Sequence, residues 1–374
     1  MKILFVDTWL RGLSFINPVA RYFDDDDEIC FVHCSSLYGA GVSQEIVSDF
    51  PGVIIDTLDY DHNYSKVIDI IRPDIVVFIT AHGLVQRYFN FICSRRGLPC
   101  FYFMHGARFS ESLPSRLKKG VRVIISRLEL YGLQAFYMLR DSFGIDKNSF
   151  LGCLFFLLEF FCLKNRFNNS PLSKFGMSYK KILINHSADK SYFDKFFGSV
   201  QSYEIVGNVS VYENAVTGKL DSSSRDSIVF LSQPDCLDDI RDCGIRSDIE
   251  KMRNVTGAAL IVRLHPGDMT RGSEYANLLG PCDIDGSKDM SMALSRARLL
   301  VGFNSAALLA GNVLGIPTLS YETKSFPSLP YLDGELDFSD AALASHFVSR
   351  HKEDKNSYPE HPAKLIVKHV YRAI

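Results

Sequence analysis

The sequence lacks the features that mark several common classes of protein. It has nine cysteines in 374 residues, but no Cys-x-x-Cys pair, so we expect neither a zinc site nor a disulfide framework. No run of about 18 apolar residues occurs, and no transmembrane helix is therefore expected. The formal net charge is only −2, which gives no electrostatic support for binding nucleic acid. Together with an N-terminus that indicates a strand rather than a signal peptide, these absences favour a cytoplasmic protein.

Short apolar segments alternate with helical patterns along most of the chain. With 47% hydrophobic and 22% charged residues, the composition is globular and the length suffices for two domains. Alternating strands and helices predict an α/β fold with doubly wound parallel sheets. We expect a first domain at residues 1–220 and a second at 221–374, joined by a Ser-rich linker that starts at Asp221. The final residues, 363–374, are predicted to form a helix of the second domain.

One predicted strand of the second domain ends in a cluster of polar residues. The apolar run Leu260 to Val262 is typical of a buried parallel strand. It is followed by Arg263 and His265, at the carboxyl end where open α/β sheets bind ligands. Pro266 cannot donate to a strand ladder, so the strand must stop there.

The next predicted strand, Leu299 to Gly302, leads into a helix. Asn304 and Ser305 are expected to cap this helix, which should start at about Ala306. A helix N-terminus with a hydroxyl is suited to binding phosphate. We expect the two strands to be adjacent, so that their ends together offer a guanidinium, an imidazole, a hydroxyl and a helix dipole. The pattern therefore predicts a phosphate clamp.

These motifs resemble the nucleotide-binding half of bacterial GT-B glycosyltransferases. The sequence Arg263-x-His265-Pro266, the Asn-Ser helix start and Gly315-Ile-Pro are similar to motifs of sialyltransferases, polysialyltransferases and Kdo transferases. Gln233-Pro234 after a strand resembles the same families, and the teichoic-acid polymerases are more distantly similar. In these families a histidine and a serine hold the donor phosphate. The resemblance assigns that role to His265 and Ser305, with Arg263 and Gln233 beside them.

The resemblance also implies a fold and an activity. The fold would be GT-B, with two Rossmann-like domains facing a central cleft. The activity would be inverting, metal-independent transfer of a nonulosonic acid or Kdo from a CMP-activated donor to a glycan or lipid-linked glycan of a capsule or lipopolysaccharide. No cofactor and no metal are expected; the acidic run Asp24 to Glu28 favours a solvated turn, because consecutive carboxylates converge poorly on an ion.

Other activities of the same fold remain open. UDP-sugar enzymes of this fold often carry a ribose-binding glutamate on the helix after the phosphate turn, where this chain has Ala310 and Gly311. This difference favours a CMP-linked donor over a UDP-sugar. A UDP-sugar or CDP-glycerol transferase, a GT-B epimerase and a non-catalytic glycan-binding paralogue are the alternatives.

The catalytic base should come from the first domain. The sialyltransferases carry it on an acidic triplet ending in glycine, which this chain lacks. His105, followed by a glycine as in the teichoic-acid polymerases, is the first candidate, and a structural histidine is the alternative. His82 is the second candidate. Asp7 and Arg11, after the first strand, could also line the acceptor side.

Residues 107–170 form a segment of different character. Six basic residues lie between Arg108 and Arg127, and the segment from Leu151 to Leu163 is almost wholly apolar. One interpretation is an insertion of helices that cover the sheet. The other is an interfacial helix with a basic patch that makes peripheral contact with an anionic membrane. The sequence leaves both open.

Overall fold

The computed structural model divides the chain into two compact units. The first comprises Met1–His105, Lys119–Val209 and Glu360–Ile374, and the second holds the described residues between Ser210 and Pro359. The structure describes residues 1–38, 49–81, 83–105, 121–162, 179–185, 189–190, 193–194, 202–209, 212–213, 225–233, 236–242, 244–265, 268–287, 290–303, 305–314, 316–321, 323 and 361–372.

A seven-stranded sheet, parallel throughout, forms the centre of the first unit, in the order β3-β2-β1-β4-β5-β6-β7. The strands are β1 (Lys2–Val6), β2 (Glu28–His33), β3 (Val53–Asp56), β4 (Ile75–Phe78), β5 (Cys100–Phe103), β6 (Lys181–Ile184) and β7 (Tyr203–Ile205). The chain adds β2 and β3 on one side of β1 and then crosses to β4 on the other. Ligands of such sheets bind where the order reverses, here at the carboxyl ends of β1 and β4.

Side chains of β1 alternate between the two faces of this sheet, as a period of two requires. Leu4 and Val6 pack under one helical layer, and Ile3 and Phe5 under the other. The first layer contains α2 (Tyr64–Ile71) and α3 (Leu84–Arg95), and the second contains α1 (Leu13–Ala20) and α15 (Pro362–Tyr371). Short 3-10 turns lie at Leu10–Gly12, Ser35–Tyr38 and Thr57–Tyr60.

The C-terminal helix α15 belongs to the first unit, although the sequence analysis placed it with the second domain. Its residues Ile366, Val367 and Val370 are buried in the core beside Phe5. His361 caps the helix, with its Nδ1 accepting from the backbone N–H of Ala363 at 3.1 Å. The apolar face of this helix is therefore covered by the first sheet.

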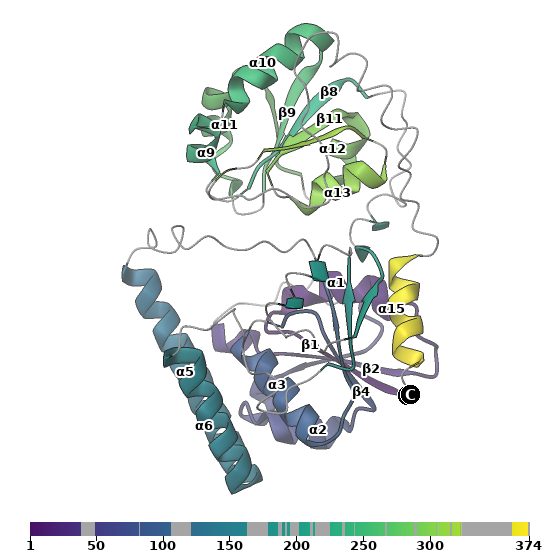
Figure 1. Cartoon of the computed structure of the whole chain (residues 1–374), viewed down its shortest axis with the longest axis vertical. Helices are drawn as coiled ribbons and strands as arrows, with labels where there is room; N and C mark the ends of the chain where they lie inside the picture. Colours follow the sequence, from purple (N-terminus) through teal and green to yellow (C-terminus); the bar gives the residue numbers. More distant parts are fainter. Residues whose placement is uncertain are drawn as a thin grey trace. The chain divides into compact units, whose positions relative to one another are not determined.

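Two long helices, α5 (Val121–Ile145) and α6 (Lys147–Cys162), form a hairpin on the first unit. Figure 1 shows them together as one rod beside α2 and α3. A helical insertion was expected here, between β5 and β6. Among the residues that the structure describes, no helix is both long and apolar enough to cross a membrane.

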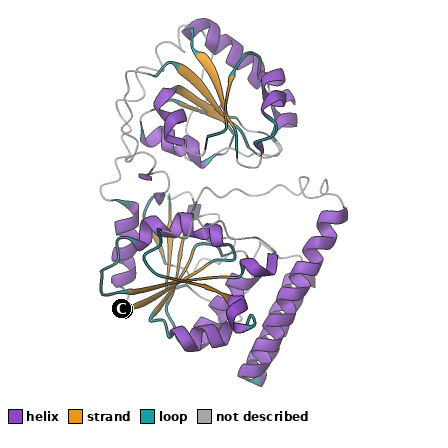
Figure 2. Cartoon of the chain, turned by 180° about the vertical axis from the view of Figure 1, so that it is seen from behind, coloured by secondary structure: helices purple, strands orange, loops and turns teal. Residues whose placement is uncertain are grey.

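The second unit is built on a five-stranded parallel sheet of order β10-β9-β8-β11-β12 (Figure 2). Its strands are β8 (Ser227–Leu231), β9 (Ala259–Arg263), β10 (Asp283–Asp285), β11 (Ala297–Gly302) and β12 (Thr318–Ser320). One face packs against α9 (Leu237–Asp242), α10 (Ile245–Thr256) and α11 (Gly272–Leu279), and the other against α12 (Met290–Arg296) and α13 (Ala306–Val313).

The strand order corrects one expectation. β9 and β11, which carry the two halves of the predicted phosphate clamp, are separated by β8. The reason is that the second unit, like the first, starts with an inner strand and adds later strands on both sides of it. Three carboxyl ends, those of β9, β8 and β11, therefore lie side by side at one edge of the sheet.

Candidate functional site

In the second unit, His265 lies just beyond the end of β9. Its backbone N–H donates to the Ser232 hydroxyl at 2.7 Å, and the backbone N–H of Ser232 donates to the carbonyl of Arg263 at 3.0 Å. These two hydrogen bonds join the ends of β8 and β9 at His265. Partial burial lowers the pKa of His265 below its usual 6.5, and the carboxylate of Asp268 opposes this shift. The ring is therefore mainly neutral at pH 7.

The loop after His265 is held by a buried network that sequence reasoning missed. The Asp268 backbone N–H donates to the His265 carbonyl at 2.8 Å. The Asp268 carboxylate accepts from the Tyr275 hydroxyl at 2.6 Å, and Tyr275 also lies 3.2 Å from the Cys236 sulfur. Asp268 and Tyr275 are both buried, so Asp268, which bonds to the His265 carbonyl, is itself held by a side chain of α11. No local pattern points to Tyr275, because its partners come from other elements.

Arg263, predicted to bind phosphate, has partners within the protein. Its Nη1 lies 3.0 Å from Asp285 and 2.6 Å from the Ser287 hydroxyl, and the residue is only 7% exposed. The ion pair joins the end of β9 to the end of β10. Asp285 belongs to an Asp-x-Asp sequence, Asp283-Ile-Asp285, whose second carboxylate is thus engaged by an arginine. These contacts hold Arg263 between the ends of β9 and β10, and its binding of phosphate stays a prediction.

Ser305 caps helix α13 at the end of β11, as expected. Its hydroxyl oxygen accepts from the backbone N–H of Ala307 at 3.2 Å, which leaves the hydroxyl hydrogen for another acceptor. The turn is tight, because the Ser305 N–H donates to the Phe303 carbonyl at 2.8 Å. Ala306 is the first residue of α13, while Asn304 and Pro266 lie outside the described residues.

Gln233 follows β8 and lies between these two ends. Its backbone N–H contacts the Cys236 sulfur at 3.4 Å, and its carbonyl accepts from the Tyr275 hydroxyl at 3.4 Å. Neighbouring strands are about 4.8 Å apart, so His265 and Ser305 begin from strand ends roughly 10 Å apart with Gln233 between them. Residues His265, Gln233 and Ser305 therefore follow three neighbouring strands at this edge.

In the first unit, Asp7 lies at the point where the strand order reverses. It follows β1, is 6% exposed, and accepts a hydrogen bond from the Gln86 amide at 3.1 Å. Burial raises the pKa of Asp7 to about 6, although hydrogen bonds from Thr8, Thr80 and Gln86 oppose the shift. A buried carboxyl that titrates near neutrality at the ligand-binding edge of a sheet is a candidate for acid–base chemistry.

Gln86 and Gly12 are residues around Asp7 that sequence reasoning missed. Gln86 is fully buried on α3, and its amide nitrogen also donates to the Thr8 hydroxyl. A side chain at Gly12 would collide with the Asp7 carboxylate, so only glycine allows the turn after β1 to pass this close. Arg11, the other predicted residue here, is exposed in the same turn.

His105 follows β5, two strands away from Asp7. Its Nδ1 lies 2.6 Å from the carbonyl oxygen of Ile79, at the end of β4, and its ring packs 4.5 Å from that of Phe15. The side chain is half-buried. The structure thus brings Asp7 and His105 to the carboxyl edge of one sheet, on either side of β4. His82 lies outside the described residues.

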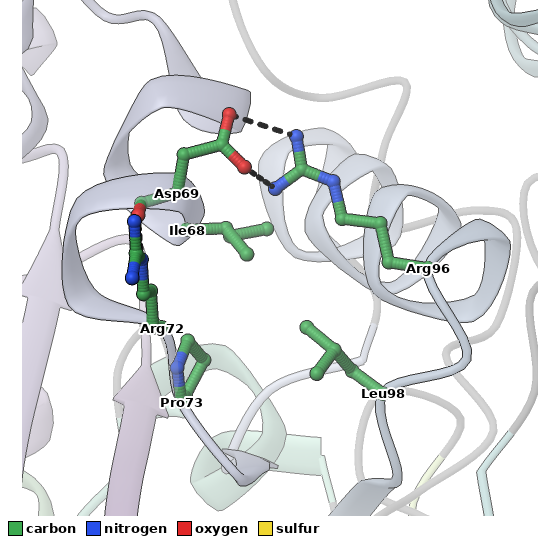
Figure 3. A pocket seen from close by; sticks show the side chains of 6 residues that line it. All are labelled: Ile68, Asp69, Arg72, Pro73, Arg96 and Leu98. Atoms are coloured by element: carbon green, nitrogen blue, oxygen red, sulfur yellow. Dashed lines mark hydrogen bonds and ion pairs between the residues drawn. The ribbon is translucent and has the colours of Figure 1, made fainter.

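A pocket of about 430 Å³ lies at the opposite edge of the first sheet (Figure 3). It is lined by Ile68, Asp69, Arg72, Pro73, Arg96 and Leu98. Arg72 and Leu98 come just before β4 and β5, so the pocket is at the amino ends of the strands. Its Arg96 is paired with the Asp69 carboxylate at 2.8 Å, and the Arg72 Nε donates to the Asp69 carbonyl at 3.3 Å. It is separate from the edge that carries Asp7 and His105.

No group of three or more His, Cys, Asp or Glu residues that could hold a metal occurs in the part of the chain that the structure describes.

Comparison with solved structures shows which fold the two units define. An S. aureus MnaA–UDP co-structure matches with a TM-score of 0.57 and 12% identity, over 100% of this chain and 96% of that chain. UDP-GlcNAc 2-epimerase from Methanocaldococcus jannaschii matches with a TM-score of 0.55 and 13% identity, over 100% of both chains. The glycotransferase of kitacinnamycin matches with a TM-score of 0.55 and 10% identity, over 100% of this chain and 99% of that chain.

These neighbours, together with the two parallel sheets, establish a GT-B fold with two Rossmann-like domains. No family model matches the sequence. No curated protein matches it either.

Proposed function

We propose that this chain is a glycosyltransferase that uses a nucleotide-activated sugar, with the nucleotide held by the second unit. The observation that carries the proposal is the placement of His265 and Ser305 on either side of the end of β8. Three strand ends, one of them leading into a helix N-terminus, form a binding edge for an anion.

The chemistry of this edge suits a phosphate. A neutral imidazole can donate one N–H, the Ser305 hydroxyl can donate its hydrogen, and the dipole of α13 favours negative charge. Because Arg263 is engaged by Asp285, the edge carries little fixed positive charge. These hydrogen-bond donors and the helix dipole are better matched to the single phosphate of a CMP-linked sugar than to a diphosphate.

The helix after the phosphate turn supports the same donor. Ala310 is buried against the sheet, and a side chain at Gly311 would collide with Leu300 and Thr318. Neither position can hold the ribose-binding glutamate that many UDP-sugar enzymes have there. We therefore propose a CMP-activated nonulosonic acid or Kdo as donor, and a glycan or lipid-linked glycan of a bacterial surface as acceptor.

Transfer with inversion requires a base on the acceptor hydroxyl. His105 is the proposed base and Asp7 the proposed acceptor-side group, both at the carboxyl edge of the first sheet. The two units thus have separate tasks, nucleotide binding in one and acceptor activation in the other.

Donor consumption tests the proposal. The purified chain is incubated with CMP-sialic acid, CMP-Kdo, CDP-glycerol or UDP-GlcNAc, with and without a capsular or lipopolysaccharide oligosaccharide, and released nucleotide is measured by chromatography. The proposal expects release of CMP, increased by an acceptor. Turnover of UDP-GlcNAc alone would contradict it.

Epimerisation is the second candidate function, favoured by a buried acid at the switch point of the first sheet and by likeness to the UDP-GlcNAc 2-epimerase from Methanocaldococcus jannaschii. Inverting a ring carbon that bears hydrogen breaks its C–H bond, so an epimerase incorporates solvent deuterium. Deuterium uptake at C2 of UDP-GlcNAc in heavy water, without nucleotide release, would favour this activity over transfer.

A further inference from the structure

The hairpin of α5 and α6 is fixed to the first unit by one face of each helix. On α5, Met138 is fully buried, and the buried carboxylate of Asp141 accepts from the Ser65 hydroxyl at 2.9 Å and from the Tyr88 hydroxyl at 3.0 Å. On α6, Cys153 is fully buried and packs in the same core. The hairpin is therefore anchored on α2 and α3 and presents its other side outward.

The outward side carries large apolar residues at helical spacing. They lie three, four or seven positions apart, opposite the buried residues, and therefore share one face of each helix. They are Leu133, Phe136 and Phe143 on α5 and Leu151, Phe155 and Leu158 on α6, which together we call the hairpin face. The sequence analysis singled out the α6 segment but not its continuation on α5.

The exposed aromatic area of this face is large for a protein surface. Phe136, Phe143 and Phe155 are 59%, 74% and 57% exposed. At about 200 Å² for each ring, they leave roughly 400 Å² of aromatic surface in water. Patches of this size on a single chain commonly mark an interaction site.

The charges around the hairpin face have one sign. Arg140 and Lys147 are exposed at the same helical spacing as the apolar residues, and Arg140 also donates to the backbone carbonyl of Asp61. Of the acids among residues 131–158, Asp141 is buried and Asp146 lies 3.7 Å from Arg95 in an ion pair. A partner of complementary chemistry is therefore apolar and anionic.

We propose that the hairpin face docks on an anionic phospholipid surface. Two helices side by side can each insert an apolar face to the level of the acyl chains, with Phe rings at the boundary and the two cations among the headgroups. A second copy of this chain fits less well. A two-fold contact would pair this surface with itself and so bring like charges, those of Arg140 and Lys147, into one interface.

Vesicle flotation of the full chain, without nucleotide, tests the proposal. Vesicles of phosphatidylcholine alone are compared with vesicles containing one quarter phosphatidylglycerol, at low and high salt. The wild type is expected to float with the anionic vesicles, and at least fivefold less with the neutral ones or at high salt. Absence of binding to the anionic vesicles would overturn the proposal.

Two variants locate the contact. Phe143→Asp/Phe155→Asp should lower the vesicle partition coefficient at least tenfold. Lys147→Glu should lower it about tenfold on anionic vesicles only, and this change is compatible with the fold because an acid is favoured in the first turn of α6. The matched control, Val255→Asp/Met292→Asp, changes two exposed apolar residues of the second unit and should bind as the wild type does.

Two further outcomes would contradict the proposal. One is equal loss of vesicle binding in the control and the face variant. The other is that the wild type is a dimer, that Phe143→Asp/Phe155→Asp is a monomer, and that neither protein binds vesicles. In that case a second copy of the chain would be what covers the hairpin face. Nucleotide binding is measured in parallel, so failure of the membrane proposal is separable from failure of the proposed function.

Discussion

The Nδ1 atom of His105 lies 2.6 Å from the carbonyl oxygen of Ile79. A carbonyl can only accept a hydrogen bond, so the neutral ring carries its proton on Nδ1, and Nε2 is the nitrogen that can accept one. The end of β4 therefore sets the tautomer of a histidine that follows β5. If His105 is the general base, the backbone at the end of β4 sets both the orientation and the tautomer of its ring.

Replacement of His105 tests the proposed base. His105→Ala should lower the rate of transfer by roughly 10²–10⁴-fold, because the acceptor hydroxyl loses its proton acceptor. Nucleotide affinity should stay within about twofold of wild type, since the residue belongs to the first unit. Steady-state rates and calorimetric binding are measured on the same preparation. Near-normal turnover in His105→Ala would place the base elsewhere.

The pH dependence of stability tests the environment of Asp7. Its pKa is about 6 in the folded state against a usual value of 3.8, so between pH 4 and 6 the folded state binds more protons than the unfolded state. The contribution of this carboxyl to the free energy of unfolding is therefore lost as pH rises through that range, and the total loss is about 2–3 kcal/mol. Asp7→Asn should remove this dependence.

The measurement is the difference in melting temperature between wild type and Asp7→Asn from pH 4 to 8. The melting temperature of the wild type should fall relative to that of Asp7→Asn as pH rises. Above about pH 7 the difference should become constant. A constant difference across this range would show that Asp7 titrates normally. If Asp7 also accepts a proton during catalysis, wild-type turnover should fall below pH 6.

Arg263 is expected to act on stability. Arg263→Ala leaves the half-buried Asp285 without its partner and should lower the free energy of unfolding by about 2–3 kcal/mol. The exposed pair of Arg246 and Glu250, at 3.1 Å, supplies the control, and Arg246→Ala should cost no more than about 0.5 kcal/mol. Denaturant unfolding compares the two. If both variants lost equally little stability and Arg263→Ala no longer bound nucleotide, Arg263 would instead be a phosphate ligand.

Two substitutions at Ser305 separate helix capping from phosphate binding. Ser305→Ala removes the cap on α13 and should cost about 1 kcal/mol of stability, with a moderate loss of nucleotide affinity. Ser305→Asp keeps the cap but places a negative charge at the binding edge. It should keep wild-type stability and lose nucleotide affinity at least tenfold. If Ser305→Asp binds nucleotide normally, the phosphate is not at this helix.

Much of the architecture could be predicted from local sequence. Apolar runs that end at prolines and glycines gave the strands, as at Pro73 before β4 and Pro266 after β9. The helix cap at Ser305 was predictable because capping is a local interaction. Which strands are neighbours could not be predicted in the same way, because the position of β8 between β9 and β11 depends on tertiary packing.

Partners from distant elements could not be predicted either. The Asp7 carboxylate meets Gln86 across 79 positions, and Arg263 meets Asp285 across 22. Helix α15 follows the second unit in sequence but packs on the first sheet, because its apolar face is complementary to that core. For the hairpin, the sequence left burial and membrane contact open, and the structure shows one buried face and one exposed apolar face on each helix.

Nucleotide binding by wild type and His265→Ala is the most direct test of the proposed function. Isothermal titration with CMP, CDP, UDP and GDP should show the tightest binding for a cytidine nucleotide. Loss of a hydrogen bond to the charged phosphate in His265→Ala should cost about 1.5–3 kcal/mol, or more than tenfold in affinity. Affinity should also rise as pH falls below 6.5, because phosphate favours the protonated imidazole. Equal affinity for all four nucleotides, or wild-type affinity in His265→Ala, would contradict the account.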